Sequence, residues 1–373
     1  MTANRYSQLR RSAHASIQVE PARMIPTPMT ISPTTKHERH WPQRLGDIIA
    51  AFAGKRILVI GDMIADEYIV GAASRLSREA PIPVINQRER FTVPGGAMNP
   101  AVNARALGAE VHVLGLIGED ESGRRLRQRL TELGIHHDLL IAEPQRPTST
   151  KMRVLAGNSQ GAMQHIARVD TIDTTPPDAT TIARMMAGIE TLVPNIDGVI
   201  FSDYDNGLMV LPLIESALRM AAKYECISVA DAHAQMRRYQ RVTAITPNQN
   251  EAEAEAGILI RDHNSLQRAG ARLLDDTNVR GVLITRGGEG MSLFQQDSTT
   301  FDIPVYPSEV RDTIGAGDTV TATFALGLAT GASMADAATI ANVAAGLVVR
   351  RLGCATTTPD ELHHAVAGLE AAW

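Results

Sequence analysis

The sequence is poor in cysteine and in aromatic residues, and it has no long uninterrupted apolar run. Only two of its 373 residues are cysteine, Cys226 and Cys354, and they lie far apart without metal-ligand spacing. This pattern argues against a disulfide scaffold and fits a reducing compartment, so a cytoplasmic location is expected. We interpret both thiols as buried or incidental. Gly, Asp or Arg interrupts each apolar run before the roughly 20 residues needed to span a bilayer, so no membrane partner is expected.

The chain also lacks an excess of basic charge. Its formal net charge is −5, which gives no global positive field of the kind that draws proteins to nucleic acid. No nucleic-acid partner is therefore expected, and any anionic ligand must be held by local groups. A Gly-x-Gly-x-x-Gly fingerprint does not follow the first apolar run, which argues against a nicotinamide-dependent dehydrogenase.

Apolar residues make up 44% of the sequence, enough to bury a sizeable core in one main domain with an appendage. Residues 1–43 are rich in Pro, Ser, Thr and Arg and have no sustained apolar period. They are predicted to be a disordered N-terminal tail, an extension rather than a targeting peptide. The ordered domain is predicted to occupy residues 44–373 and to start with a short amphipathic helix over 45–52.

Short apolar runs alternate with helical stretches along this domain. The alternation favours an α/β fold with a mostly parallel sheet covered by helices. Two segments, 68–93 and 150–170, interrupt this alternation. They are predicted to be extended strands outside the main sheet, forming a small β lid over a cleft. The strands predicted for the main sheet are 57–60, 111–116, 198–201, 227–230, 244–246 and 281–285.

The most informative stretch is residues 312–318, DTIGAGD, which precede a predicted helix. Small residues let the backbone approach a ligand, and free amides at a helix start carry partial positive charge. The amides of Gly315, Ala316 and Gly317 are therefore a candidate anion hole for a phosphoryl group. Asp318 beside them could accept the proton of an attacking hydroxyl. The alternative is a glycine-rich loop with an acidic N-cap.

A second glycine motif, GGAMNPA, occupies residues 95–101. Together, and in this order, the two motifs resemble those of the ribokinase-like (PfkB) carbohydrate kinases, and other landmarks agree over roughly residues 55–360. The resemblance implies a three-layer α/β/α fold with a mostly parallel central sheet and a small β lid. It also implies ATP-dependent phosphoryl transfer to a sugar hydroxyl, with Asp318 as general base. A non-catalytic sugar-binding relative is the alternative, which the presence of Asp318 and Glu251 disfavours.

The resemblance implies ATP and Mg2+ as cofactors. Residues 246–251, TPNQNE, are similar to the family's Asn-x-x-Glu element, in which Glu251 would organise Mg2+ through water. Residues 285–290, TRGGEG, look like its nucleotide-phosphate loop. A monovalent cation, K+, near Asp312 and the loop around Gly353 is implied by the resemblance alone. The nucleotide-binding residues that it implies are Asn248, Glu251, Thr285, Gly287, Gly290 and Asn342.

On the sugar side, the first predicted strand ends near Gly61, and open α/β sheets bind ligands at the carboxyl ends of their strands. Carboxylates there can accept hydrogen bonds from sugar hydroxyls. Asp66 matches the position from which relatives grip the sugar, whereas Asp62 is either a sugar ligand or an N-cap. The substrate-binding residues predicted at this edge are Asp62, Asp66, Gly95, Gly96 and Asn99.

Within the family, the chain most resembles the D-glycero-β-D-manno-heptose-7-phosphate kinases, which phosphorylate the anomeric hydroxyl of a sugar phosphate. Lys151 and Arg153 are then candidates for holding the distal phosphate, because cationic donors pair well with a dianion. Their alternative role is that of solvated strand cations. The matching stretches are 61–66, 74–77, 79–84, 150–155, 168–170 and 202–204.

Departures from the heptose kinase pattern leave the acceptor open. Relatives carry Asp-Pro-Lys where residues 231–233 are Asp-Ala-His, Gln-Gln where residues 164–165 are Gln-His, and proline in place of Arg78. Fructose, a hexose phosphate or adenosine is therefore the alternative acceptor. We also expect a kinase-only chain without the nucleotidyltransferase domain that some heptose kinases carry. A homodimer through the lid is expected, because exposed strand edges seek partners.

Overall fold

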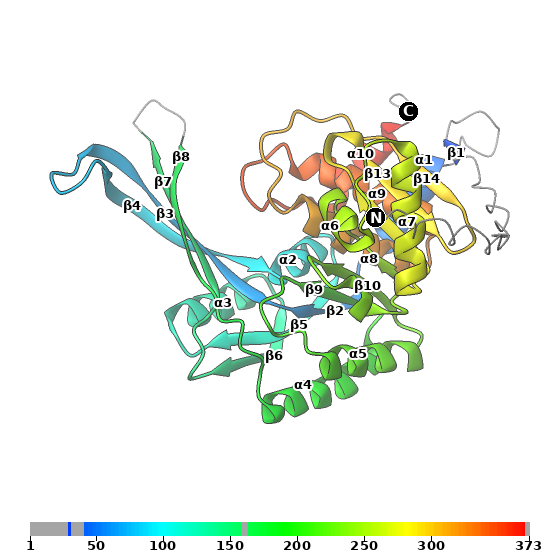
Figure 1. Cartoon of the computed structure of the whole chain (residues 1–373), viewed down its shortest axis with the longest axis horizontal. Coiled ribbons are helices and arrows are strands. Elements are labelled where there is room, and N and C mark those ends of the chain that lie inside the picture. The colour runs from blue at the N-terminus through cyan, green and yellow to red at the C-terminus, as the bar shows by residue number, and fades with distance from the viewer. Residues whose placement is uncertain (1–28, 31–40, 158–162, 370–373) are drawn as a thin grey trace, which may run out of the picture.

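The computed structural model describes residues 29–30, 41–157 and 163–369, and its largest feature is a ten-stranded sheet (Figure 1). The strand order is β1-β14-β13-β12-β11-β10-β9-β2-β5-β6. Neighbouring strands from β12 to β6 run parallel, whereas β13 is antiparallel to both of its neighbours. The mostly parallel sheet predicted from the sequence is therefore confirmed. The strands are β1 Met29–Thr30, β2 Arg56–Gly61, β5 Glu110–Gly118, β6 His136–Glu143, β9 Gly198–Asp203, β10 Ile227–Ala232, β11 Ala244–Ile245, β12 Gly281–Thr285, β13 Met291–Gln295 and β14 Thr300–Ile303.

Helices cover both faces of this sheet because its inner strands are apolar on both sides. Along β2, Ile57 and Val59 belong to one core cluster, while Leu58 and Ile60 belong to the other. Such continuous apolar runs are typical of parallel strands buried on both faces. The first cluster lies under α1, α2, α3, α8, α9 and α10, and the second under α4, α5, α6 and α7, which gives three layers. The helices are α1 Trp41–Ala50, α2 Met98–Ala106, α3 Glu121–Glu132, α4 Ala179–Leu192, α5 Leu211–Lys223, α6 Gln249–Ala256, α7 His263–Thr277, α8 Ala316–Ala329, α9 Met334–Val348 and α10 Pro359–Ala367.

A second, four-stranded sheet projects away from the main sheet, in the order β4-β3-β7-β8 (Figure 1). Its first two strands extend deeper than the predicted segment 68–93, because Met63, Ile64 and Ala65 at the base of β3 are buried. Its far end is open to solvent, with Leu76 67% exposed and β8 exposed along its whole length. The strands are β3 Met63–Leu76, β4 Pro83–Gly96, β7 Thr150–Gly157 and β8 Gln164–Thr171.

The beginning of the chain has more structure than the predicted tail over 1–43 allows. Met29–Thr30 forms β1, which pairs in parallel with β14, and α1 begins at Trp41 rather than at residue 45. The earlier start has a physical cause, since the Trp41 indole and the Arg44 guanidinium both donate to Asp336 Oδ1, at 3.3 and 2.8 Å. The remainder of the predicted tail lies outside the described residues. Within the described part of the chain, no helix is both long enough and apolar enough to cross a membrane.

Candidate active site

Two glycine motifs that are far apart in the sequence meet at one point of the molecule. β4 ends at Gly96 and leads into α2, while α8 begins directly after Gly315. The Asn99 side-chain amide Nδ2 donates a hydrogen bond to Asp318 Oδ2 at 2.6 Å, across a separation of 219 residues in the sequence. A Cβ on Gly315 would lie 2.8 Å from Asn99 Nδ2, so the close approach depends on glycine. The two motifs therefore contribute to one site.

The start of α8 presents backbone amides next to Asp318. Gly315 has a φ of +78°, a conformation that favours glycine. The Ala316 amide donates a hydrogen bond to the Thr313 carbonyl at 3.2 Å, so its partner is within the chain and not a phosphate. A helix leaves its first amides without intrahelical partners, and a Cβ on Gly317 would meet no atom within 4 Å. In the predicted anion hole, the amides of Gly317 and Asp318 are thus available to a phosphate, whereas the Ala316 amide is already hydrogen-bonded.

The Asp318 carboxyl group is buried, with 8% of the residue exposed. Tyr204 OH donates to its Oδ1 at 3.1 Å, opposite the Asn99 bond to Oδ2. Burial, and then the negative charge of Asp231, raise the pKa of Asp318 to about 7, against the opposing effect of its two donors. A carboxyl group with a pKa near the operating pH is suited to general base catalysis.

Asp231, His233 and Glu251 lie together beside Asp318. His233 Nδ1 is 2.9 Å from Glu251 Oε1, and the possible metal-ligand atoms of the three residues lie within 4.8 Å of one another. The His233 ring meets the Tyr204 ring edge-on, with 4.4 Å between the centroids. Burial, and then the charge of Glu251, raise the pKa of Asp231 to about 6, and the hydrogen bond to Glu251 raises the pKa of His233. We refer to Asp231, His233 and Glu251 as the His233 cluster.

The His233 cluster fits a divalent cation in charge and spacing, since two carboxylates face one imidazole. Carboxylate oxygens are ligands that Mg2+ accepts, directly or through its waters. Asn248, which was predicted to bind nucleotide, has a structural partner instead. It caps α6, where its Oδ1 accepts the Glu251 amide at 3.0 Å and Glu251 Oε2 accepts the Asn248 amide at 2.8 Å. This capping box fixes the position of Glu251.

At the base of the small sheet, Asp66 and Arg153 form a buried ion pair. Arg153 Nη1 donates to Asp66 Oδ1 at 2.6 Å, and the guanidinium carbon lies 5.4 Å from the centre of the Tyr68 ring. A Cβ on Gly95 would lie 2.4 Å from Asp66 Oδ2, so glycine lets this carboxylate lie against the β4 backbone. Gly96 follows with a φ of +56°, which again favours glycine.

Lys151 is the less engaged of the two predicted cations. Its backbone on β7 is in register with Asp66 of β3 and Asp170 of β8. Its Nζ lies 5.1 Å from the centre of the Tyr204 ring, and within the described residues it makes no ion pair. Tyr204 OH in turn donates to Asp318, so Lys151 lies on the side of the small sheet that faces Asp318.

Asp62, predicted as a sugar ligand or an N-cap, has its carboxylate occupied by the loop after β9. Oδ2 accepts the amides of Tyr204 at 2.9 Å and Asn206 at 3.2 Å, and Oδ1 accepts that of Leu208 at 3.4 Å. The N-cap interpretation is wrong, because no helix begins at Asp62. Burial, and then the charge of Asp203, raise its pKa to about 6. Asp62 thus anchors the loop that presents Tyr204.

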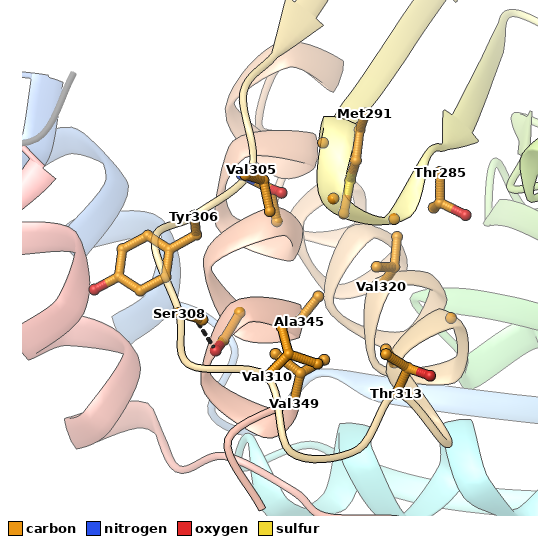
Figure 2. Close-up of a pocket in the computed structure, with 17 residues that line it drawn as sticks. Thr285, Met291, Val305, Tyr306, Ser308, Val310, Thr313, Val320, Ala345 and Val349 are labelled. Atoms are coloured by element: carbon orange, nitrogen blue, oxygen red, sulfur yellow. Dashed lines mark hydrogen bonds between the residues drawn. The ribbon is translucent and has the colours of Figure 1, made fainter.

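A largely apolar cavity of about 400 Å3 opens at the start of α8 (Figure 2). Thr285, Gly287 and Gly290 from the predicted phosphate loop line it, as do Ala316 and Gly317. Its apolar walls come from the loop after β14 and from α9, as the labelled side chains in Figure 2 show. The wall residues with the largest apolar side chains are Met291, Val305, Tyr306, Val310, Val320 and Val349.

Asn342 also lines this cavity, but its side chain is engaged. Nδ2 donates to the Pro304 carbonyl at 2.7 Å and so holds the wall-forming loop against α9. Val305 and Val310 were not predicted as cavity residues, because the loop that carries them has no periodic pattern. Tyr204 and His233 were not predicted as site residues either, although both lie in stretches that resemble or depart from the family pattern.

Cys354, which was expected to be buried or incidental, lies beside the anion hole. A Cβ on Gly315 would lie 3.4 Å from its Sγ, and burial raises the pKa of the thiol to about 12, which keeps it protonated. Asp312 lies close to the same loop. Its Oδ1 accepts the Ile314 amide at 3.0 Å, and its Oδ2 accepts the Gly353 amide at 2.8 Å. The two segments named for a monovalent cation therefore meet, although both Asp312 oxygens already have backbone donors.

The three-layer fold, the apolar cavity and the acid at a helix start together define a phosphotransferase of the ribokinase-like class. The signature of the pfkB family carbohydrate kinase matches residues 55–361. The chain belongs to this family.

Similar proteins agree with this assignment. The bifunctional protein HldE of Caulobacter vibrioides is 39% identical over 321 residues, which cover 85% of this chain and 65% of that protein. The HldE of Geobacter sulfurreducens is 40% identical over 309 residues, covering 82% and 61%. The chain thus spans less than two thirds of the length of these relatives.

Solved structures support the fold alone. Arabidopsis thaliana ribokinase complexed with ribose and ATP has a TM-score of 0.65 at 20% identity, covering 84% of this chain and 99% of that one. Phosphofructokinase-2 from Escherichia coli in complex with potassium has a TM-score of 0.68 at 14% identity, covering 85% and 99%.

Proposed function

We propose that this carbohydrate kinase transfers the γ-phosphoryl group of ATP to the anomeric hydroxyl of a heptose 7-phosphate. The observation that carries the proposal is the 2.6 Å hydrogen bond between Asn99 and Asp318, the residue that directly follows Gly317 of the cavity wall. The Asp318 carboxylate is therefore close to a cavity that can hold a nucleotide and, through Tyr204, to Lys151 on β7.

In this mechanism ATP occupies the cavity, with its terminal phosphate at the start of α8. The amides of Gly317 and Asp318 stabilise the charge that develops on the transferring group. Asp318 takes the proton of the attacking hydroxyl, for which its pKa of about 7 suits it. Tyr204 and Asn99 hold the carboxylate in place through its two oxygens. Glu251, with Asp231 beside it, would hold the Mg2+ that accompanies ATP. This ion would neutralise part of the phosphate charge.

On the acceptor side, Asp66 and the Gly95–Gly96 backbone contact the sugar, and Lys151 binds its distal phosphate. Lys151 suits this role because, among the described residues, it forms no ion pair. Arg153 is paired with Asp66, so it orients that carboxylate and contributes to the phosphate only by its field. Of the two predicted cations, only Lys151 is therefore unpaired within the part of the chain that the structure describes, which favours an unphosphorylated acceptor such as fructose or adenosine as the second candidate.

We further propose that the small sheet is a lid and the dimer surface, and that the protein is cytoplasmic. Support for the surface comes from exposed apolar side chains on and beside β8, Met163 at 46%, Ile166 at 40% and Val169 at 55%. Exposed apolar patches of this kind mark interaction sites. A K+ ion near Asp312 is supported by the potassium complex of the E. coli phosphofructokinase-2 structure. Light scattering of the purified chain tests the dimer, since a monomer at all concentrations contradicts it.

An acceptor panel tests the proposed substrate. Purified chain with Mg2+-ATP is assayed for ADP release with heptose 7-phosphate, heptose, fructose, fructose 6-phosphate and adenosine. We expect heptose 7-phosphate to give the highest kcat/KM. A higher value for fructose or adenosine replaces the heptose assignment, whereas ADP release with none of the five rejects this choice of acceptors.

A further inference from the structure

The His233 cluster contains a nitrogen donor that a magnesium site does not require. His233 comes directly after β10, on a side chain that is 45% exposed, and Glu251 is fixed by its capping box at the start of α6. A carboxyl oxygen of Asp231 completes the set, with all ligand atoms within 4.8 Å of one another. The three donors come from two elements on one edge of the main sheet.

The spacing of these donors matches a directly bound metal ion. Ligand atoms about 2.1 Å from Zn2+ in a tetrahedral site lie roughly 3.4 Å from one another. The Nδ1 of His233 and Oε1 of Glu251 are 2.9 Å apart, so a small opening of this pair admits an ion. The Asp231 carboxylate approaches from β10, the strand that leads into His233, and the exposed imidazole can rotate without disturbing the core.

The charge of the surroundings also calls for a cation. Asp231, Glu251 and Asp318 bring three carboxylates together, and His233 is the one imidazole that neutralises them directly among the described residues. Lys151 Nζ is 5.1 Å from the centre of the Tyr204 ring and forms no ion pair with these carboxylates within the described residues. Thr321 Oγ1 donates to Asp231 Oδ2 at 3.2 Å, the one hydrogen bond to this carboxylate within the described residues, and it supplies no positive charge.

The donor set decides which cations are favoured. Mg2+ takes oxygen ligands and gives up its waters reluctantly, whereas Mn2+, Co2+ and Zn2+ accept an imidazole nitrogen beside carboxylates. We propose that Asp231, His233 and Glu251 bind a divalent transition-metal ion directly, more tightly than Mg2+, next to the carboxylate of Asp318. The inference deepens the proposed function by naming the metal class, but binding itself does not depend on which acceptor the enzyme uses.

A second group, Glu110, His112 and His136, also brings metal-ligating atoms within 4.8 Å. There the two imidazole rings stack, with 4.4 Å between centroids and 15° between planes. Nitrogen lone pairs lie in the ring plane, so stacked rings cannot both point at one ion without turning apart. This group carries no proposal, but it offers a matched control for the first.

The test is a Co2+ titration of the full chain without nucleotide or acceptor, followed by visible absorption and by calorimetry. We expect a one-to-one complex that millimolar Mg2+ does not displace. His233→Gln, which keeps a polar group of similar size, should weaken binding by more than about 100-fold, since even outer-sphere partners of metal ligands typically cost 10–100-fold. His112→Gln should leave the titration unchanged.

Asp231→Asn is the second variant, and it should also weaken Co2+ binding. Thermal melting in the absence of metal checks that each variant is folded. Loss of the Co2+ signal in both cluster variants, but not in His112→Gln, supports the proposal. Absence of binding to the unmodified chain, or binding unaffected by His233→Gln in a folded protein, overturns it. Neither result touches the acceptor panel, which is run with Mg2+ alone.

Discussion

The junction at the start of α8 and the small sheet contribute to the same site in different ways. At the junction, contacts are short and buried, and they depend on glycine, as the Asn99–Asp318 bond of 2.6 Å beside Gly315 illustrates. On the small sheet, Asp66 and Arg153 form an ion pair between strands, and the outer strand β8 is exposed along its length. The junction is thus enclosed by tertiary contacts, whereas the small sheet is held by backbone pairing between its strands and presents its outer strand to a ligand or a second chain.

This difference indicates that the chemistry and the choice of acceptor are separable. Changes at the junction should lower turnover with every acceptor, because they alter the base and the amides. Changes on the small sheet should alter the affinity for the acceptor and leave the affinity for ATP unchanged. The variants below test whether the two regions separate in this way.

The largest effect is expected for Asp318→Asn. Removing the base should lower kcat by about 10²–10⁴, since general base catalysis is typically worth that much. ATP binding, measured by calorimetry, should be retained. Asp275→Asn, an exposed carboxylate on α7, is the control and should be as active as the unmodified enzyme. Turnover of Asp318→Asn within about tenfold of the original contradicts the assignment of the base.

Gly95→Ala should impair acceptor binding more than turnover. The added Cβ would lie 2.4 Å from Asp66 Oδ2 and would push this carboxylate away from β4. We expect the KM for the sugar to rise by at least about tenfold while the KM for ATP changes little, because a 1.4 kcal/mol loss is tenfold in affinity. Gly368→Ala, whose Cβ would approach no atom closer than 3.5 Å, is the matched control. An equal rise in both KM values would argue against separable regions.

Lys151→Met sharpens the comparison by removing one charge from the small sheet. A charged hydrogen bond is worth about 1.5–3 kcal/mol, so the KM for a phosphorylated acceptor should rise about 10- to 100-fold. The KM for an unphosphorylated acceptor should stay the same. If both acceptors weaken equally, Lys151 does not bind the distal phosphate. Arg168→Met, on exposed β8 and paired with Asp170, is the control.

The smallest effect concerns stability and pH. Burial raises the pKa of Asp318 to about 7 from its ordinary value of 3.8, so this group contributes its full stability below pH 3.8 and loses that contribution progressively as the pH rises to 7. Asp318→Asn should therefore raise the melting temperature at pH 8 by at least about 2 °C. At pH 5, between the two pKa values, the gain should be smaller, because the unfolded chain has ionised this group but only part of the interval from 3.8 to 7 has been crossed. A gain of equal size at both pH values rules out this explanation.

The fold and the junction could be predicted from the sequence because strict local constraints produce them. Continuous apolar runs such as β2 require burial on both faces, and Gly315 and Gly317 mark a backbone that a ligand approaches. Side-chain partners could not be predicted in this way. Asp62 binds backbone amides of a loop more than a hundred residues away, and Asn248 caps its own helix.

The predictions that failed share a physical origin. The start of α1 depends on Asp336, which lies 295 residues from Trp41 in the sequence. The base of β3 was not predicted because its buried residues follow the strand-end motif at Gly61 without a turn signal. Cys354 reaches the anion hole through a loop whose position depends on the Gly353–Asp312 hydrogen bond. Each of these features is decided by tertiary contacts, and local patterns carry no information about them.

The most direct test of the account is a double-mutant cycle between Asn99 and Asp318, read out as kcat with saturating ATP and acceptor. If the two glycine motifs form one site, Asn99 positions the base, and Asn99→Ala should lower kcat in the unmodified enzyme but cost nothing further in Asp318→Asn. Residues in direct contact show such non-additivity, whereas independent residues do not. Losses that multiply in the double variant would contradict the claim that the two motifs act together.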